Sequence, residues 1–172
     1  MHGCTNAPVQ CRAFVHWCVR TSGCEIVTLA MRVLGIDVGR RRVGLAISDP
    51  SGTLARPLTT VTVTSAADAV DRVVAEVTRL SSEEDGLAAI VVGVPARLDG
   101  SPTDHTAGVA QFMAALSARV PVPVVGGDER LTSHEAESRL AVGERDWRRR
   151  KKKLDAAAAA IILQDYLDQH RL

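Results

Sequence analysis

The chain has 172 residues, 46% of them hydrophobic, so its length and composition fit one compact domain with a single core. Lysine and arginine total 21 against 20 aspartates and glutamates, and the net charge of +1 gives no chain-wide electrostatic sign of nucleic acid or membranes. No apolar run approaches the roughly 20 residues that cross a bilayer, and residues 1–30 lack the apolar core of a secretory signal. We therefore expect a cytoplasmic protein with no membrane partner, in which any electrostatic site is local.

The first 30 residues differ in composition from the rest, because they contain all the cysteines of the chain: Cys4, Cys11, Cys18 and Cys24. Their spacing includes no close Cys-x-x-Cys pair, so zinc binding together with His2 or His16 is weakly indicated, and nothing else points to an oxidising compartment. A regular strand pattern begins at Met31. We therefore expect residues 1–30 to be an N-terminal extension, disordered or the product of a mis-assigned start, and residues 31–172 to form the only domain.

From Met31 onward the chain alternates between strand and helix patterns. Residues 33–37, 43–48 and 58–63 predict three strands, and Ser65 with Asp68 predicts the cap of a helix over residues 66–80. Residues 87–92 are continuously apolar, as in a strand buried on both faces. A helix follows a cap at Ser101, then a strand at residues 122–125, a helix opening at Thr132 and a last helix over residues 154–167. This order predicts an α/β fold with a mixed sheet.

Asp37 ends the first apolar strand, in the sequence VLGIDVG, with Gly39 two residues later. Burying an unpaired carboxylate costs several kcal/mol, so an acid at this place needs a partner such as a metal ion. The alternative is a turn-forming aspartate whose carboxylate accepts nearby backbone N–H groups. The residues alone leave both interpretations open.

A second acidic group follows the strand at residues 122–125, in the segment GGDER. The carboxyl ends of strands are the usual ligand sites of open α/β sheets, and neighbouring residues in a strand face opposite ways. Only one of Asp128 and Glu129 can therefore face a cleft readily. Arg130 is suited to bidentate binding of a phosphate, or it pairs with the outward acid.

Asp155 begins the alanine-rich last helix and shares one face with Ala158, Ala159 and Ile162. Small side chains allow a helix to lie close to a sheet, which would bring Asp155 towards the strand ends. The alternative role is a favourable interaction with the helix N-terminus, worth roughly 0.3–1 kcal/mol. That role explains an acid in the first turn but not one that faces the core.

A dense basic run directly precedes Asp155, and its candidate nucleic-acid contacts are Trp147, Arg148, Arg149, Arg150, Lys151, Lys152 and Lys153. Runs of like charge are often only solvated surface. The interleaved tryptophan could stack on a base, and positive charge beside acids is what a phosphodiester substrate needs. Three acids on separate elements with cations beside them suggest a site for Mg²⁺ or Mn²⁺, in which two ions about 4 Å apart act on a phosphodiester.

Four ordered segments of the chain, LGIDVGRRRVGLAISD, IVVGVPARLDGS, DERLTSHEA and KKLDAAAAAIILQDYL, resemble the signature segments of the YqgF/RuvX family. The resemblance implies an RNase H-like fold, with a five-stranded mixed sheet whose first three strands are antiparallel, flanked by helices. It also implies a metal-dependent nuclease that trims the 5′ end of precursor 16S ribosomal RNA, related to the Holliday-junction resolvase RuvC. The family's acidic positions map onto Asp37, Glu129 and Asp155, with Asp128 as the substitute for Glu129.

Three functions stay open from the sequence. The leading prediction is a nuclease that acts on RNA and uses Mg²⁺ or Mn²⁺. The second is a structure-selective nuclease for four-way DNA junctions, which would need a symmetric dimer with two opposed sites, so the chain is expected to be a monomer or a homodimer. The third is a non-catalytic module that binds RNA or the ribosome, for which binding would survive loss of the acids.

Overall fold

The computed structural model describes residues 16–20, 26–95, 104–128 and 147–170, with the backbone alone described at 16–20, 26–30, 104–105, 128 and 147–153. A mixed sheet has the strand order β5-β4-β3-β6-β7. Its strands are β3 (Arg32–Val38), β4 (Arg42–Ser48), β5 (Ala55–Thr62), β6 (Leu87–Val94) and β7 (Val124–Asp128). β3, β4 and β5 are antiparallel, whereas β6 and β7 run parallel to β3. The expected RNase H-like arrangement is confirmed.

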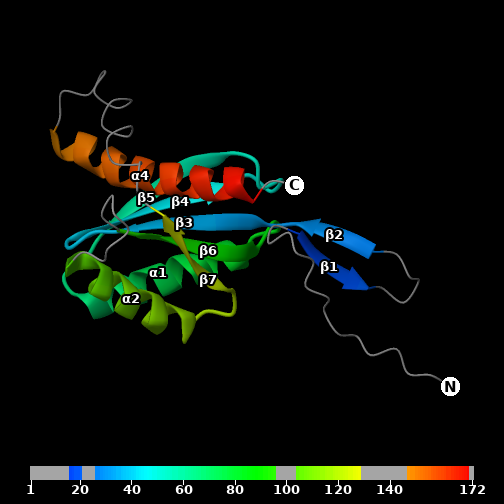
Figure 1. Cartoon of the computed structure of the whole chain (residues 1–172), viewed down its shortest axis with the longest axis horizontal. Coiled ribbons are helices and arrows are strands. Elements are labelled where there is room, and N and C mark those ends of the chain that lie inside the picture. Colours follow the sequence, from blue (N-terminus) through cyan, green and yellow to red (C-terminus); the bar gives the residue numbers. More distant parts are fainter. Residues whose placement is uncertain (1–15, 21–25, 96–103, 129–146, 171–172) are drawn as a thin grey trace.

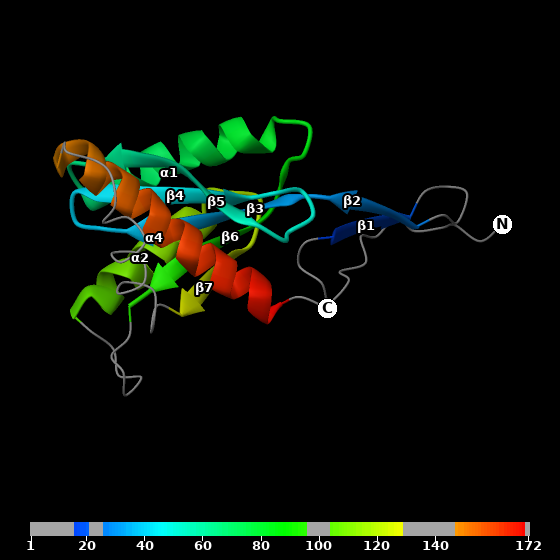
Figure 2. The same ribbon diagram turned by 90° about the horizontal axis from the view of Figure 1, so that it is seen from above.

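Helices cover both faces of this sheet (Figures 1 and 2). α1 (Ala66–Ser81) and α2 (Asp104–Ser117) lie on one face, and α4 (Trp147–Gln169) lies on the other. We call these the α1/α2 face and the α4 face. Side chains alternate between them along each central strand, so that Ile36, Leu45 and Ile90 enter the core beside α1 and α2, whereas Val33 and Val91 pack beneath α4.

The predicted elements in the described ranges are found, and β7, α4 and β5 differ from their predicted starts by two residues or more. β7 begins at Val124, because Pro123 has no N–H for the ladder and only its carbonyl pairs, accepting a hydrogen bond from the Ile90 N–H at 2.9 Å. It then continues through two glycines to Asp128. α4 begins at Trp147 rather than at Leu154, since the basic residues are good helix formers. β5 spans Ala55–Thr62 and so begins three residues early.

The capping prediction for α1 is confirmed, since the Ser65 side chain accepts a hydrogen bond from the Asp68 N–H at 3.1 Å. The cap predicted at Ser101 and the helix predicted from Thr132 lie outside the described residues. Residues 16–20 and 26–30 form a separate antiparallel hairpin, β1 (His16–Arg20) and β2 (Ile26–Ala30), which leads into β3 and projects beyond the end of the sheet (Figure 1). That residues 1–30 are an extension stays a prediction. No helix in the described ranges is long and apolar enough to span a membrane.

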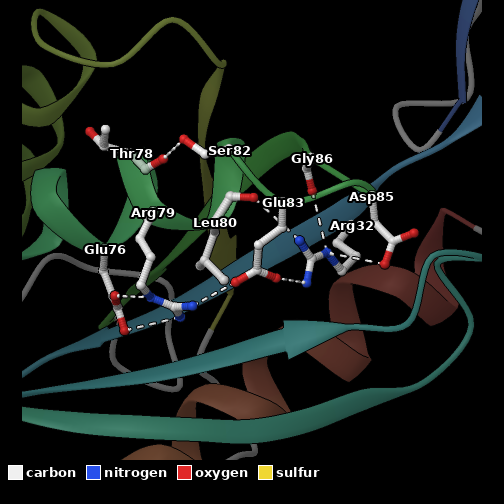
Figure 3. Close-up of polar contacts among 9 residues, drawn as sticks. All are labelled: Arg32, Glu76, Thr78, Arg79, Leu80, Ser82, Glu83, Asp85 and Gly86. Carbon is white, nitrogen blue, oxygen red and sulfur yellow. Dashed lines mark hydrogen bonds and ion pairs between the residues drawn. The ribbon is translucent and has the colours of Figure 1, made fainter.

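Buried Arg32 anchors the first residue of β3 to the end of α1 (Figure 3). Its guanidinium donates to the Glu83 carboxylate at 2.8 Å, to the Leu80 carbonyl at 3.3 Å and to the Gly86 carbonyl at 3.4 Å. Glu83 in turn pairs with Arg79 at 2.5 Å. Carbonyls at a helix C-terminus lack intrahelical partners, so Arg32 supplies one and holds β3 in place relative to α1.

α4 approaches the sheet closely because glycines lie beneath it. A Cβ added at Gly35 would lie 2.9 Å from the Ala159 carbonyl oxygen, and one at Gly44 would lie 2.0 Å from the Asp155 carbonyl oxygen. Neither position has room for a methyl group. The backbone of α4 therefore rests on the backbone of β3 and β4, which confirms that its alanines allow a close approach.

Gly44→Ala should destabilise the protein by about 3 kcal/mol or more, because the new methyl group would meet the backbone of α4 rather than a movable side chain. Urea unfolding in EDTA measures the loss. Gly108→Ala is the matched control, because Gly108 lies on the exposed side of α2 and a Cβ there meets nothing within 4 Å. This substitution should stabilise the protein by up to about 1 kcal/mol. Equal effects of the two substitutions would contradict the close packing of α4.

Candidate active site

Asp37 lies at the carboxyl end of the central strand β3 and faces α4. Val33 and Gly35 of the same strand contact α4, and side chains two residues apart share a face. Gly44 of β4 is its cross-strand partner. At the same level, Gly93 of β6 is paired with Gly127 of β7, so glycines stand on both sides of Asp37 along the sheet.

The interpretation of Asp37 as a turn-forming residue does not fit the structure. The β3–β4 turn is closed by the Gly39 N–H donating to the Arg42 carbonyl at 2.9 Å. Burial, and secondly the charge of Asp155, raise the pKa of Asp37 to about 6. A carboxylate that accepts backbone N–H bonds has the opposite shift.

Asp49 illustrates the turn-forming case in the same chain. Its carboxylate accepts hydrogen bonds from the N–H groups of Thr53 at 2.7 Å and Leu54 at 2.8 Å. Burial opposes the effect, but these hydrogen bonds and those from Ser51 leave its pKa below the usual value. The two aspartates therefore lie in opposite environments, and only that of Asp37 disfavours its charge.

Asp155 meets Asp37 through the packing of α4 on Gly44. The backbone of Asp155 lies directly on Gly44, and Gly44 is paired with Asp37. The negative charge of Asp155 accordingly raises the pKa of Asp37, in addition to the larger effect of burial. Two carboxylates from opposite ends of the sequence thus share one site.

The position of Asp155 within its helix differs from the prediction. Because α4 begins at Trp147, Asp155 lies about two turns inside the helix rather than in its first turn. The helix N-terminal charge falls off within the first turn, so it does not account for this acid. Proximity to Asp37 remains as the feature that distinguishes Asp155.

Arg42 is a site residue that sequence reasoning missed. It is the first residue of β4, and its Nε lies 2.5 Å from Oδ2 of Asp155. A signal for it exists in the sequence, because Arg42 precedes Gly44 by two residues and so shares the α4 face with Asp37. Recognising that signal requires knowing that Gly44 lies beneath Asp155.

The other predicted site residues are described in part or not at all. Glu129 and Arg130 lie outside the described residues. Asp128 is the last residue of β7. The backbone of the basic run forms the first two turns of α4, which precede Leu154 and Asp155. Within the described ranges, no group of three acidic, histidine or cysteine side chains is placed to hold a metal ion.

The two described acids nevertheless fit a divalent metal by their chemistry. Mg²⁺ and Mn²⁺ prefer hard carboxylate oxygens, and a cation between Asp37 and Asp155 would relieve the repulsion of their like charges. Asp37 and Asp155 provide such oxygens on a strand end and a helix that packs rigidly against it. The third carboxylate of the prediction would come from the segment after β7.

The fold and this pair of acids define an RNase H-like α/β domain with a carboxylate site at the end of its central strand. The family model "RuvX: Holliday junction resolvase" matches residues 31–169, and the chain belongs to this family. A relative from Chloroflexus aggregans named "Putative pre-16S rRNA nuclease" is 42% identical over 139 residues, which is 81% of this chain and 94% of the relative. A relative of the same name from Caldanaerobacter subterraneus is 40% identical, over 82% of this chain and 99% of its own. The structure of Thermus thermophilus RuvC with a Holliday junction substrate has a TM-score of 0.47 at 20% identity and covers 81% of this chain and 95% of that one.

The raised pKa of Asp37 predicts that the metal-free site costs stability at neutral pH. The pKa of Asp37 rises from 3.8 to about 6 on folding, so the cost is absent below pH 3.8. It grows between pH 3.8 and 6, where the carboxylate is ionised in the unfolded chain but protonated in the folded one, and it is complete above pH 6. Asp37→Asn should therefore raise the free energy of unfolding by at most about 3 kcal/mol at pH 7.5 and by much less at pH 4.5.

Urea unfolding in EDTA at the two pH values measures this difference. Glu84→Gln, which neutralises an exposed acid far along the chain, serves as the control and should show no such dependence on pH. Parallel stability curves for Asp37→Asn and the unsubstituted protein would contradict a buried, charge-disfavouring site.

Proposed function

We propose that the chain is a divalent-metal-dependent nuclease that hydrolyses phosphodiester bonds and processes the 5′ end of pre-16S ribosomal RNA. The observation that carries the proposal is that two carboxylates, Asp37 and Asp155, lie close together at the carboxyl end of the central strand. The names of the relatives support the substrate, and the RuvX family supports the reaction class.

Asp37, Asp155 and Glu129 would hold one or two Mg²⁺ or Mn²⁺ ions. When bound, such ions supply an activated water and stabilise the leaving oxygen of a phosphodiester. We take Glu129 as the third acid, with Asp128 as its substitute, because the DER segment resembles the family's acidic motif.

The basic run would hold the nucleic-acid backbone next to these acids. Lys153 precedes Asp155 by two residues of the same helix, a rise of about 3 Å along its axis. Six consecutive cations, from Arg148 to Lys153, span more than one helical turn. Together with Arg130 they supply phosphate contacts, and Trp147 supplies a surface on which a base stacks.

Cleavage of labelled precursor rRNA should require Mg²⁺ or Mn²⁺, stop in EDTA, and fall by at least about 100-fold in Asp37→Asn and Asp155→Asn, because removing a metal ligand removes the chemistry it holds. Glu129→Gln should cause a similar loss and Asp128→Asn a much smaller one. Single-turnover cleavage at saturating protein measures the rate.

The same assay separates the remaining alternatives. The description of the family model favours a four-way DNA junction as the second candidate substrate, and faster cleavage of a synthetic junction than of rRNA would replace the first proposal by a resolvase. Tight RNA binding in both aspartate variants, with no cleavage by any form of the protein, would instead identify a non-catalytic RNA-binding module. Wild-type cleavage rates in both variants would contradict the proposed site.

Neutralising Arg148, Arg149 and Arg150 together to glutamine should weaken RNA binding and make its salt dependence shallower. Each lost phosphate contact should reduce the slope of log K against log salt by about 0.7–0.9. The matched control neutralises three exposed arginines, Arg72, Arg79 and Arg119, which lie on or after the helices of the opposite face. Fluorescence anisotropy in an Asp37→Asn background measures binding without cleavage. Equal slopes in the two triple variants would mean that the basic run makes no phosphate contacts.

A further inference from the structure

The ion pair between Arg42 and Asp155 occupies the proposed metal site. Nε of Arg42 and Oδ2 of Asp155 are 2.5 Å apart, and both atoms are shielded from solvent although their side chains are each about a quarter exposed, 25% and 24%. One of the carboxylate oxygens proposed for metal binding is thus in contact with a guanidinium. The cation and Arg42 would compete for it.

Arg42 reaches Asp155 because of its place in β4. It precedes Gly44 by two residues and lies on the same face, and the backbone of Asp155 rests on Gly44. Its neighbours in the turn, Arg40 and Arg41, are exposed. Arg42 is accordingly the member of this arginine triplet that the fold directs at the acids.

The contact neutralises charge within the site. Two carboxylates that share a partly buried site repel each other, and a permanently charged guanidinium relieves this repulsion. The two buried atoms meet as an ion pair without the alignment of a hydrogen bond. A guanidinium binds phosphates well through two parallel N–H bonds, so a phosphate is a suitable alternative partner for Arg42.

Arg32 shows what a purely structural arginine looks like in this chain (Figure 3). Its residue is only 6% exposed, and its guanidinium donates to a carboxylate and to two backbone carbonyls. Those partners belong to the end of α1 and the following turn, far from any candidate site. Arg42 differs in partner, in exposure and in bonding geometry.

We propose that Arg42 is a positioning residue that serves as the counter-ion of Asp155 while the site lacks metal and moves to a substrate phosphate when a divalent cation occupies the carboxylates. This inference rests on the proposed function and adds a role for a residue outside the predicted site. It makes metal loading and phosphate binding mutually supportive, because the cation releases the group that binds the phosphate.

The test measures Mn²⁺ binding and RNA binding separately. Isothermal titration of the metal-free protein with Mn²⁺ should give a Kd about tenfold tighter for Arg42→Gln, because a competing charge beside the ion is removed. Arg41→Gln removes the same charge from an exposed position in the same turn and should change the Kd by less than about threefold in 0.1 M salt. Anisotropy with a labelled single-stranded RNA, with Ca²⁺ in place of Mg²⁺, should show weaker binding for Arg42→Gln but an unchanged affinity in EDTA.

Opposite signs of the two effects distinguish this role from a structural one, because an arginine that merely holds α4 in place would weaken both when removed. Should Arg42→Gln fail to fold, Arg42→Lys retains the charge and should keep a near-normal Mn²⁺ Kd with weaker RNA binding, since a point charge cannot bind a phosphate through a fork. Equal Mn²⁺ affinities for Arg42→Gln and Arg41→Gln would overturn this inference alone. Absence of Mn²⁺ binding by the unsubstituted protein would overturn the proposed metal site as well.

Discussion

The backbone of α4 rests directly on Gly44 and Gly35, and the candidate site depends on this contact. A Cβ at Gly44 would come within 2.0 Å of the Asp155 carbonyl oxygen. This contact sets the height of the helix above the sheet and its position along β4. Ala159 and Ala160, on the buried side of α4, have small side chains and keep the rest of the interface between helix and sheet thin. Gln164 ties the later part of the helix to the start of β5, accepting from the Ala55 N–H at 2.9 Å and donating to the Thr53 carbonyl at 3.1 Å.

The charge of Asp37 opposes folding rather than assists it. Burial and the neighbouring charge of Asp155 raise the pKa of Asp37, so the metal-free fold tolerates its ionised form at a cost. A surface carboxylate at the same strand end would avoid that cost. The cation that we propose for this site would offset that cost by binding the folded state.

The charged residues at the two ends of β3 lie in different environments. At its start, Arg32 donates to Glu83, to the Leu80 carbonyl at the end of α1 and to the Gly86 carbonyl after it, which anchors the strand to the α1/α2 face. At its end, Asp37 faces α4 and is placed beside a like charge. The anchor at the start of the strand thus helps to hold Asp37 in a constant position at its end.

The element types and the individual acids were predictable from the sequence, because each depends on local pattern. Periods of two and 3.6 residues identified the strands and α1, the Ser65 cap set the start of that helix, and the continuous apolar run marked β6 as buried on both faces. The start of α4 was predicted wrongly, since arginine and lysine propagate a helix as readily as alanine and the run carries no stop signal before Trp147. The bounds of β7 followed from its pairing with β6, which no local pattern shows.

By itself, the sequence determined which groups exist and on which kind of element they lie: a strand-end Asp37, an Asp155 on an alanine-rich helix, and cations next to it. Only the tertiary structure decided that Asp37 and Asp155 share a site and that Arg42 joins them. The reason is physical. The meeting of residues 37 and 155 depends on the backbone-to-backbone contact at Gly44, and a glycine in a strand pattern reports the absence of a side chain but not what fills the space.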